Sequence, residues 1–143
     1  MRLKLTLIRE ADPPYRVGEP ILSPAEAARL LGPIIADEPQ EVFMVAVCDA
    51  RHRYRGHYEV SRGSATTSIV HPREVFAAAL MRNASALFLF HNHPSGDPKP
   101  SDEDVAVTRR LVHAAELLGL RILDHVIVGH AGAYHSMKEA GLL

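Results

Sequence analysis

The order of apolar segments along the chain predicts a three-layer domain of the α/β or α+β class. Residues 42–48 and 86–90 form uninterrupted apolar runs, which is typical of strands covered on both faces. Segments with helical periodicity begin near residues 24, 72 and 101. Because strands buried on both faces need a cover on each, we expect helices on both sides of one sheet.

The first forty residues predict one strand and one helix. Leucines alternate with polar residues over residues 1–7, which indicates a half-buried strand, and residues 11–20 form a proline-containing loop. A capping box at residues 23–26, with proline at the first helical position, predicts a helix over about 24–35. We expect Pro33 to end or distort that helix early, because proline lacks the backbone N–H.

The central part of the chain predicts a strand pair, a helix and a second buried strand. After the strand at 42–48, residues 54–60 return as a more polar strand that lies nearer an edge of the sheet. Residues 61–69 are rich in Gly, Ser and Thr and predict a loop. Proline then opens a helix over about 72–80, which leads to the buried strand at 86–90.

The last third predicts a long helix and two further strands. Ser101 and Asp104 have the spacing of a capping pair, and three acidic residues in the first turn suit the positive end of a helix. Gly119 is a natural helix stop. Residues 120–128 then predict a strand, and residues 133–137 a short final one.

Length and composition are those of an ordinary globular protein. The 143 residues predict one domain, 1–143, with an N-terminal strand and helix over 1–40 and a core over 41–143. The formal net charge of −1 gives no support to a nucleic-acid partner. No apolar stretch approaches a membrane span and the N-terminus lacks a signal-peptide core, so we expect no membrane partner and a cytoplasmic location.

A metal site is predicted where the second buried strand ends. In a strand, side chains at i and i+2 share a face, so His91 and His93 can direct two imidazoles to one point. A proline-rich loop follows, and the helix after it carries Asp104 in its first turn. Two nitrogens and a carboxylate form a plausible zinc triad that leaves one position for water. Since Cys48 is the only cysteine, any metal must rest on histidine and carboxylate ligands.

These residues resemble the metal signature of the JAB/MPN metalloproteases, also called JAMM proteins. The shared pattern is His-x-His, seven residues, Ser, two residues, Asp, formed here by His91, His93, Ser101 and Asp104. Three flanking words are similar to the bacterial RadC-like branch: Val-His-Pro-Arg-Glu at 70–74, His-Asn-His-Pro-Ser-Gly-Asp at 91–97 and Asp-His-Val-Ile-Val-Gly at 124–129. The similarity runs from about Glu41 to the end of the chain.

The resemblance implies a fold, a cofactor and residue roles. The sheet would be mixed and curved, in the three-layer JAB/MPN (cytidine-deaminase-like) domain, and Zn²⁺ would be held by His91, His93 and Asp104. An upstream glutamate would be the general base; Glu41 is the best match because it directly precedes a buried strand, and Glu59 is the fallback. Ser101 would donate to the oxyanion of a tetrahedral intermediate, although its hydroxyl also suits a helix cap.

Several other residues have simpler interpretations. Asp124 precedes His125 on a predicted strand, and we interpret that histidine as a core residue or as a support for a ligand rather than as a ligand. Cys48 lies in an apolar strand and is a small core residue rather than a nucleophile. Asn92 departs from the Ser or Thr found between the histidines of the eukaryotic deubiquitinating members, so a ubiquitin-type substrate is not indicated.

The leading hypothesis is a zinc metallopeptidase that hydrolyses a peptide or isopeptide bond of a peptide or protein substrate with a zinc-activated water. Two alternatives stay open. One is a non-catalytic MPN-like interaction module, which the complete ligand set disfavours. The other is a DNA-repair-associated RadC-like factor; the near-neutral charge gives that no support, and the sequence does not include the N-terminal helix-hairpin-helix region of full-length RadC-like proteins. The sequence does not specify an oligomeric state.

Overall fold

In the computed structural model of the chain, residues 1–8, 10, 17–63 and 70–143 are described. Three helices and five strands follow one another in these parts of the chain. Their bounds are α1 (Pro24–Ile35), β1 (Val42–Cys48), β2 (Tyr54–Arg62), α2 (Pro72–Met81), β3 (Ala86–Asn92), α3 (Asp102–Leu117), β4 (Arg121–Val128) and β5 (Tyr134–Ser136).

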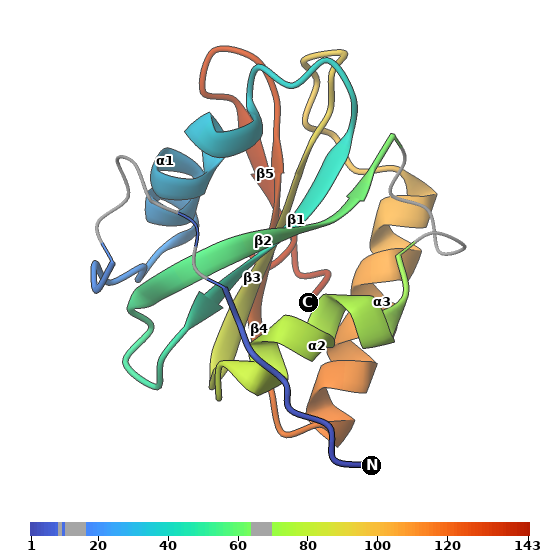
Figure 1. Ribbon diagram of the computed structural model, residues 1–143. Coiled ribbons are helices and arrows are strands. Elements are labelled where there is room, and N and C mark those ends of the chain that lie inside the picture. The colour runs from blue at the N-terminus through green and yellow to red at the C-terminus, as the bar shows by residue number, and fades with distance from the viewer. Residues whose placement is uncertain (9, 11–16, 64–69) are drawn as a thin grey trace.

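The described strands form one mixed sheet between layers of helices. The strand order is β2-β1-β3-β4-β5, and β3 and β4 are parallel whereas the other neighbours are antiparallel. Figure 1 shows α1 on one face of the sheet and α2 and α3 on the other. The three-layer α/β architecture predicted from the order of elements is confirmed, and so is the mixed sheet that the family resemblance implies.

Strand alternation divides the core into two halves. On β1 and β3, the side chains of Met44 and Phe90 pack on the α1 face, whereas those of Phe43 and Leu89 pack on the α2/α3 face. Every residue of β1 and β3 is buried, which explains why both read as continuous apolar runs. By the same alternation, His91 belongs to the α2/α3 face and Asn92 to the α1 face.

The crossover from β3 to β4 brings the ends of several elements together. Because β3 and β4 are parallel, α3 must begin near the carboxyl end of β3 and run back along the sheet. β1 is antiparallel to β3, with Phe43 paired to His91, so the amino end of β1 lies at the same place. Figure 1 shows the end of β3, the start of α3 and the start of β1 at one end of the molecule.

The N-terminal strand expected over residues 1–7 is wrong. Residues 1–8 have no regular secondary structure, and Leu3 and Leu5 are 78% and 79% exposed. Alternating leucines make a segment able to pair, but a strand forms only where a neighbouring strand supplies hydrogen bonds, and the described sheet ends at β2 and β5. The predicted loop at 11–20 lies outside the described residues over 11–16.

Pro33 does not end the first helix, contrary to expectation. The helix α1 spans Pro24–Ile35 with Pro33 inside it, and Ser23 caps its start by accepting from the backbone of Glu26. The buried side chains of Leu30, Leu31 and Ile35 attach the helix to the sheet on both sides of the proline. Packing of this face therefore outweighs the loss of one backbone donor in the last turn.

The remaining predicted elements agree with the structure to within a few residues. The chief extensions are at β2, which continues to Arg62, and at β3, which continues through His91 to Asn92. The rest of the predicted loop at 61–69 lies outside the described residues from 64 onward. Among the described helices, none is long and apolar enough to cross a membrane.

Candidate metal centre

Two histidines converge at the carboxyl end of β3. His91 is fully buried as the penultimate residue of the strand, and its Nε2 atom lies 3.2 Å from Nε2 of His93. His93 follows the strand but stays in line with it, because its backbone N–H donates to the carbonyl of Val128 on β4 over 2.9 Å. The extended backbone therefore directs both imidazoles to the same point, as the i, i+2 spacing predicts.

Asp104 reaches the same point from the first turn of α3. Its Oδ1 lies 3.2 Å from Nε2 of His91, and its Oδ2 lies 3.1 Å from Nε2 of His93. Burial raises the pKa of the Asp104 carboxyl, but hydrogen bonds with the two histidines outweigh burial and hold that pKa well below its usual range. The hydrogen bond with Asp104 in turn raises the pKa of His93. The carboxylate is thus held ionised, as a metal ligand must be.

Glu41 completes the group from the residue before β1. Its Oε1 lies 3.4 Å from Nε2 of His91 and 3.8 Å from Nε2 of His93. The side chain is 25% exposed, so it connects the buried His91 with solvent. Glu59, the fallback base, is exposed and bonded to Arg62 on β2, and it is not part of the group. Of the two glutamates, the geometry therefore favours Glu41.

The four side chains have the composition and spacing of a metal site. One donor atom each from Glu41, His91, His93 and Asp104 lies within 4.8 Å of all the others. Tetrahedral zinc with bonds of about 2.0–2.1 Å requires neighbouring donor atoms to be roughly 3.3–3.4 Å apart. The distances that join the histidines to one another and to Asp104, and His91 to Glu41, are 3.1–3.4 Å and so close to that edge, whereas His93 and Glu41 are 3.8 Å apart. The described residues therefore fit a divalent ion of this kind.

Ser101 lies at the N-terminus of α3 as part of a complete capping box. Its hydroxyl accepts from the backbone N–H of Asp104 over 3.1 Å, and the Asp104 carboxylate accepts from the backbone N–H of Ser101 over 2.8 Å. Ser101 therefore caps the helix, as its position in the sequence indicates. A hydroxyl that accepts through a lone pair keeps its own hydrogen to donate, so capping and oxyanion binding are compatible.

The loop between the ligands packs tightly against the turn after β4. Gly96 has φ +93°, and a Cβ atom there would lie 2.4 Å from Nδ1 of His130. A Cβ atom on Gly129 would lie 2.2 Å from the carbonyl oxygen of Gly96. The positive φ of Gly96 and the backbone contact at Gly129 require glycine at both positions. They fix the loop that carries Asp97, whose carbonyl lies 2.9 Å from Nδ1 of His93.

Asn92, between the two histidines, points to the opposite face and holds the segment that carries Glu41. Its Oδ1 accepts from the backbone N–H of Val42 over 2.7 Å. Its Nδ2 donates to the carbonyls of Glu38 and Gln40 over 3.2 and 2.9 Å. The three hydrogen bonds lie on both sides of Glu41, so they fix the backbone from which the glutamate reaches the histidines.

The other ring nitrogen of His91 contacts a third histidine. Nδ1 of His91 lies 2.7 Å from Nε2 of His125 on β4, and Nδ1 of His125 lies 2.6 Å from the hydroxyl of Thr108 on α3. Burial, with a smaller contribution from the neighbouring His91, lowers the pKa of His125 well below its ordinary value. His125 is therefore neutral at pH 7 and contacts a candidate ligand without joining the four-residue group.

The sequence does not predict the participation of Thr108 or the function of Asn92 in this arrangement. In the sequence, Asn92 stands out only by its departure from the Ser or Thr of related proteins. The available signal was polarity in an apolar context: Thr108 lies on the buried face of α3 and Asn92 ends a buried strand. A buried polar side chain needs a partner, but the sequence does not tell which one.

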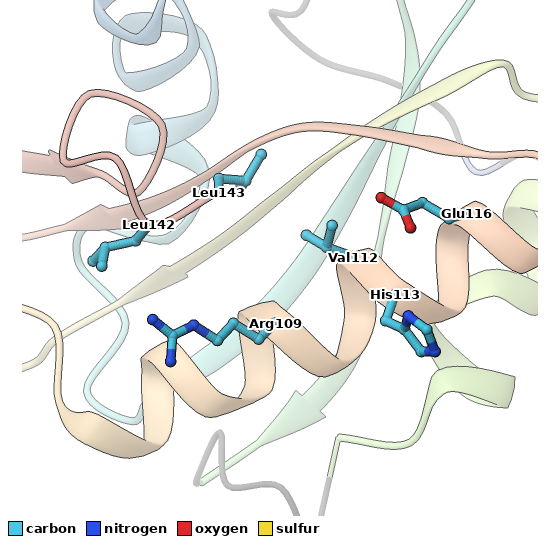
Figure 2. Close-up of a pocket in the computed structure, with 6 residues that line it drawn as sticks. All are labelled: Arg109, Val112, His113, Glu116, Leu142 and Leu143. Atoms are coloured by element: carbon cyan, nitrogen blue, oxygen red, sulfur yellow. The ribbon is translucent and has the colours of Figure 1, made fainter.

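A shallow pocket elsewhere is separate from this group. It lies between α3 and the C-terminal residues, and Figure 2 shows its lining side chains: Arg109, Val112, His113, Glu116, Leu142 and Leu143. None of the four clustered residues lines it. The candidate centre is thus identified by its converging donor atoms.

Residues 21–142 match the family model described as the RadC-like JAB domain. The chain belongs to this family. The RadC-like JAB domain includes every residue of the candidate centre, and the resemblance inferred from the sequence is confirmed. Several curated relatives carry the name UPF0758 protein. The chain is 47% identical to that of Trichlorobacter lovleyi over 125 residues, which cover 87% of this chain and 54% of the relative.

Two further relatives carry the same name. The chain is 43% identical to the UPF0758 protein of Marinobacter nauticus over 94% of this chain and 60% of the relative. It is 44% identical to that of Methanosarcina mazei over 86% of this chain and 53% of the relative. The chain thus spans about half the length of the curated relatives it matches, and their names state no activity.

Proposed function

We propose that this RadC-like JAB domain is a zinc-dependent hydrolase of the JAMM type that cleaves a peptide or isopeptide bond in a peptide or protein substrate. The observation that carries the proposal is the convergence of Glu41, His91, His93 and Asp104, whose donor atoms lie within 4.8 Å of one another. Two imidazoles and a carboxylate are the ligand set of catalytic zinc sites that keep one position open.

The four residues divide into ligands and a base. His91, His93 and Asp104 would hold the ion, because their donor atoms are buried or nearly so and are fixed by β3 and α3. When bound, zinc would supply Lewis acidity that lowers the pKa of a water and polarises a substrate carbonyl. Glu41, the most exposed of the four, would accept the proton of the attacking water and return it to the leaving amine.

Ser101 would contribute the remaining interaction of an amide hydrolase. The capping box with Asp104 fixes its backbone, so the hydroxyl is held rigidly beside the candidate ligand Asp104. From that position its hydrogen would be donated to the oxyanion that develops when an amide carbonyl is attacked. A single donor of this kind contributes on the order of a hundredfold or more to the rate.

Metal binding is tested first, by elemental analysis of the purified protein and by titration with zinc. We expect about one zinc ion per chain, as a site of this ligand set holds. The His91→Ala, His93→Ala double variant is expected to lose it, since two of its three ligands are gone. Full zinc occupancy in the double variant would refute the ligand assignment.

Hydrolysis is tested with the zinc-loaded protein, extended peptides and isopeptide-linked peptides, with new termini detected by mass spectrometry. We expect Glu41→Gln to keep its zinc and to lose roughly a hundredfold or more of the turnover, because the amide cannot accept a proton. Glu59→Gln is the matched control and should keep both. Equal turnover in the Glu41→Gln and wild-type proteins would place the base elsewhere.

A further inference from the structure

A hydrogen-bonded chain of buried groups connects helix α3 to one of the candidate ligands. It runs from the Thr108 hydroxyl to Nδ1 of His125 over 2.6 Å, and from Nε2 of His125 to Nδ1 of His91 over 2.7 Å. All three side chains are 0% exposed. Hydrogen bonds that no solvent can replace fix the positions of protons more strictly than exposed ones do.

The direction of the chain follows from its first group. The Thr108 hydroxyl lies 2.7 Å from the backbone carbonyl of Asp104, and since a carbonyl can only accept, the single hydroxyl hydrogen must be donated there. The hydroxyl oxygen is then left to accept from Nδ1–H of His125. A neutral imidazole carries one N–H, so Nε2 of His125 has a lone pair and accepts from Nδ1–H of His91.

We infer that Thr108 and His125 are positioning residues that set the tautomer of His91 for metal binding, an inference that rests on the proposed metal centre. With one proton of His91 held on Nδ1, its Nε2 is the nitrogen that can exchange the hydrogen bond with Asp104 for a bond to an ion. That Nε2 is the atom that lies 3.2 Å from both Nε2 of His93 and Oδ1 of Asp104. The hydrogen-bonded chain from Thr108 therefore selects the nitrogen of His91 that faces the other ligands.

The surroundings also hold the rings in place and couple two ligands. Phe43 on β1 stacks on His91 at 5.9 Å between ring centres and contacts His125 edge-on at 5.4 Å. The chain ends on the carbonyl of Asp104, whose carboxylate is another candidate ligand. The tautomer of one ligand and the backbone of another thus depend on the same hydroxyl. His93 differs, because its Nδ1 faces the carbonyl of Asp97 directly.

The proton positions are tested by long-range ¹H–¹⁵N correlation spectra of the zinc-loaded protein labelled with ¹⁵N-histidine. We expect His91 and His125 each to carry a proton on Nδ1, and Nε2 of His91 to show the shift of a metal-bound nitrogen. A proton on Nε2 of His125 would overturn the inference, because the chain would then run in the opposite direction. This spectrum needs no variant, so it decides even if a variant fails to fold.

The contribution of the hydroxyl is tested with Thr108→Val, which keeps the shape of the side chain, and with Thr108→Ser, which keeps the hydroxyl. We expect Thr108→Val to bind zinc about 10–100-fold more weakly and Thr108→Ser to bind it as the wild type does, since groups that orient ligands contribute on this scale. Equal zinc affinity in all three proteins would overturn the inference. If Thr108 only supported the fold, the spectrum of Thr108→Val would show the same histidine tautomers as the wild type.

Both measurements are made without substrate. If the spectra and affinities follow expectation but no amide is cleaved, the inference stands and the proposed hydrolysis fails. If amides are cleaved while His125 carries its proton on Nε2, the inference fails and the proposed function stands.

Discussion

Asn92 shows how much one side chain can contribute to a centre without belonging to it. It lies between two candidate ligands in sequence, yet it points to the α1 side and binds three backbone groups around Glu41. The side chain is 2% exposed, so water cannot replace these bonds. The position of the glutamate is therefore set from the opposite face of the sheet.

Replacing Asn92 by alanine is expected to destabilise the fold and lower turnover while the metal stays bound. The backbone N–H of Val42 would lose its buried acceptor, a loss of about 1–3 kcal/mol in the free energy of unfolding. Denaturant unfolding, the peptide assay and zinc analysis would measure the stability, the turnover and the bound metal. Asn92→Asp keeps the acceptor but sets a carboxylate against two carbonyls, so it should not rescue the protein. Unchanged stability in Asn92→Ala would show that these hydrogen bonds do not hold the segment around Glu41.

At the scale of elements, one helix start combines a cap and a candidate ligand. The box formed by Ser101 and Asp104 satisfies backbone donors of α3 and at the same time fixes the carboxylate beside His91 and His93. The stability of α3 and the geometry of the candidate centre thus depend on the same two side chains. A simple alanine substitution cannot separate them.

Three variants of Ser101 separate capping from oxyanion binding. Ser101→Ala should lose about 1 kcal/mol of unfolding free energy together with most of the turnover, whereas Ser101→Thr should keep both. Ser101→Asp should keep the stability, because aspartate caps helices well, but lose turnover, because a carboxylate cannot donate. Thermal unfolding and the peptide assay measure these outcomes. Full turnover in Ser101→Asp would limit the serine to its capping function.

The predictable elements were those with strong local signals. Proline at the first position of α1 and α2, the capping pair of α3 and the stop at Gly119, which has φ +73°, all act within a few residues of where they stand. The apolar runs of β1 and β3 were equally local. The His-x-His pattern was predictable for the same reason, since two positions of one strand share a face.

The errors and omissions concern partners distant in sequence. The leucines of residues 1–7 have the pattern of a strand, but no local signal tells whether a neighbouring strand is available. Likewise, the contact of His125 with His91 joins residues on two strands, and that of Asn92 with Val42 spans fifty positions. Such pairs depend on sheet order and register, and these are set by the packing of the whole domain and not by local sequence signals. Resemblance to a family, and not periodicity, supplied Glu41.

At the scale of the whole molecule, the candidate centre joins two of the three layers. Glu41 precedes β1, the histidines end β3 and Asp104 begins α3, so a bound ion would connect the sheet to the α3 layer. Unfolding separates these elements and destroys the site. Metal binding and global stability are therefore thermodynamically linked.

Chelation is expected to lower the melting temperature of the protein substantially. Zinc present at about a thousand times its dissociation constant adds roughly 4 kcal/mol to the free energy of unfolding. For a domain of this size, that corresponds to roughly 8–16 °C, measured by thermal unfolding with and without chelator. The His91→Ala, His93→Ala double variant is the control and should not respond. An equal response of the double variant would show that the stabilising ion binds elsewhere.

The burial of β1 and β3 on both faces has a further consequence for how the strands align. Where one face of a sheet is solvated, a shift of the strand register by one residue exposes the apolar side chains and is strongly disfavoured. Two strands that are apolar on both faces, such as β1 and β3, carry no such penalty. Here the amide of Asn92, locked onto the backbone at Glu38, Gln40 and Val42, accepts only one alignment. A polar side chain at the strand end thus fixes the register of two strands whose apolar side chains do not specify it.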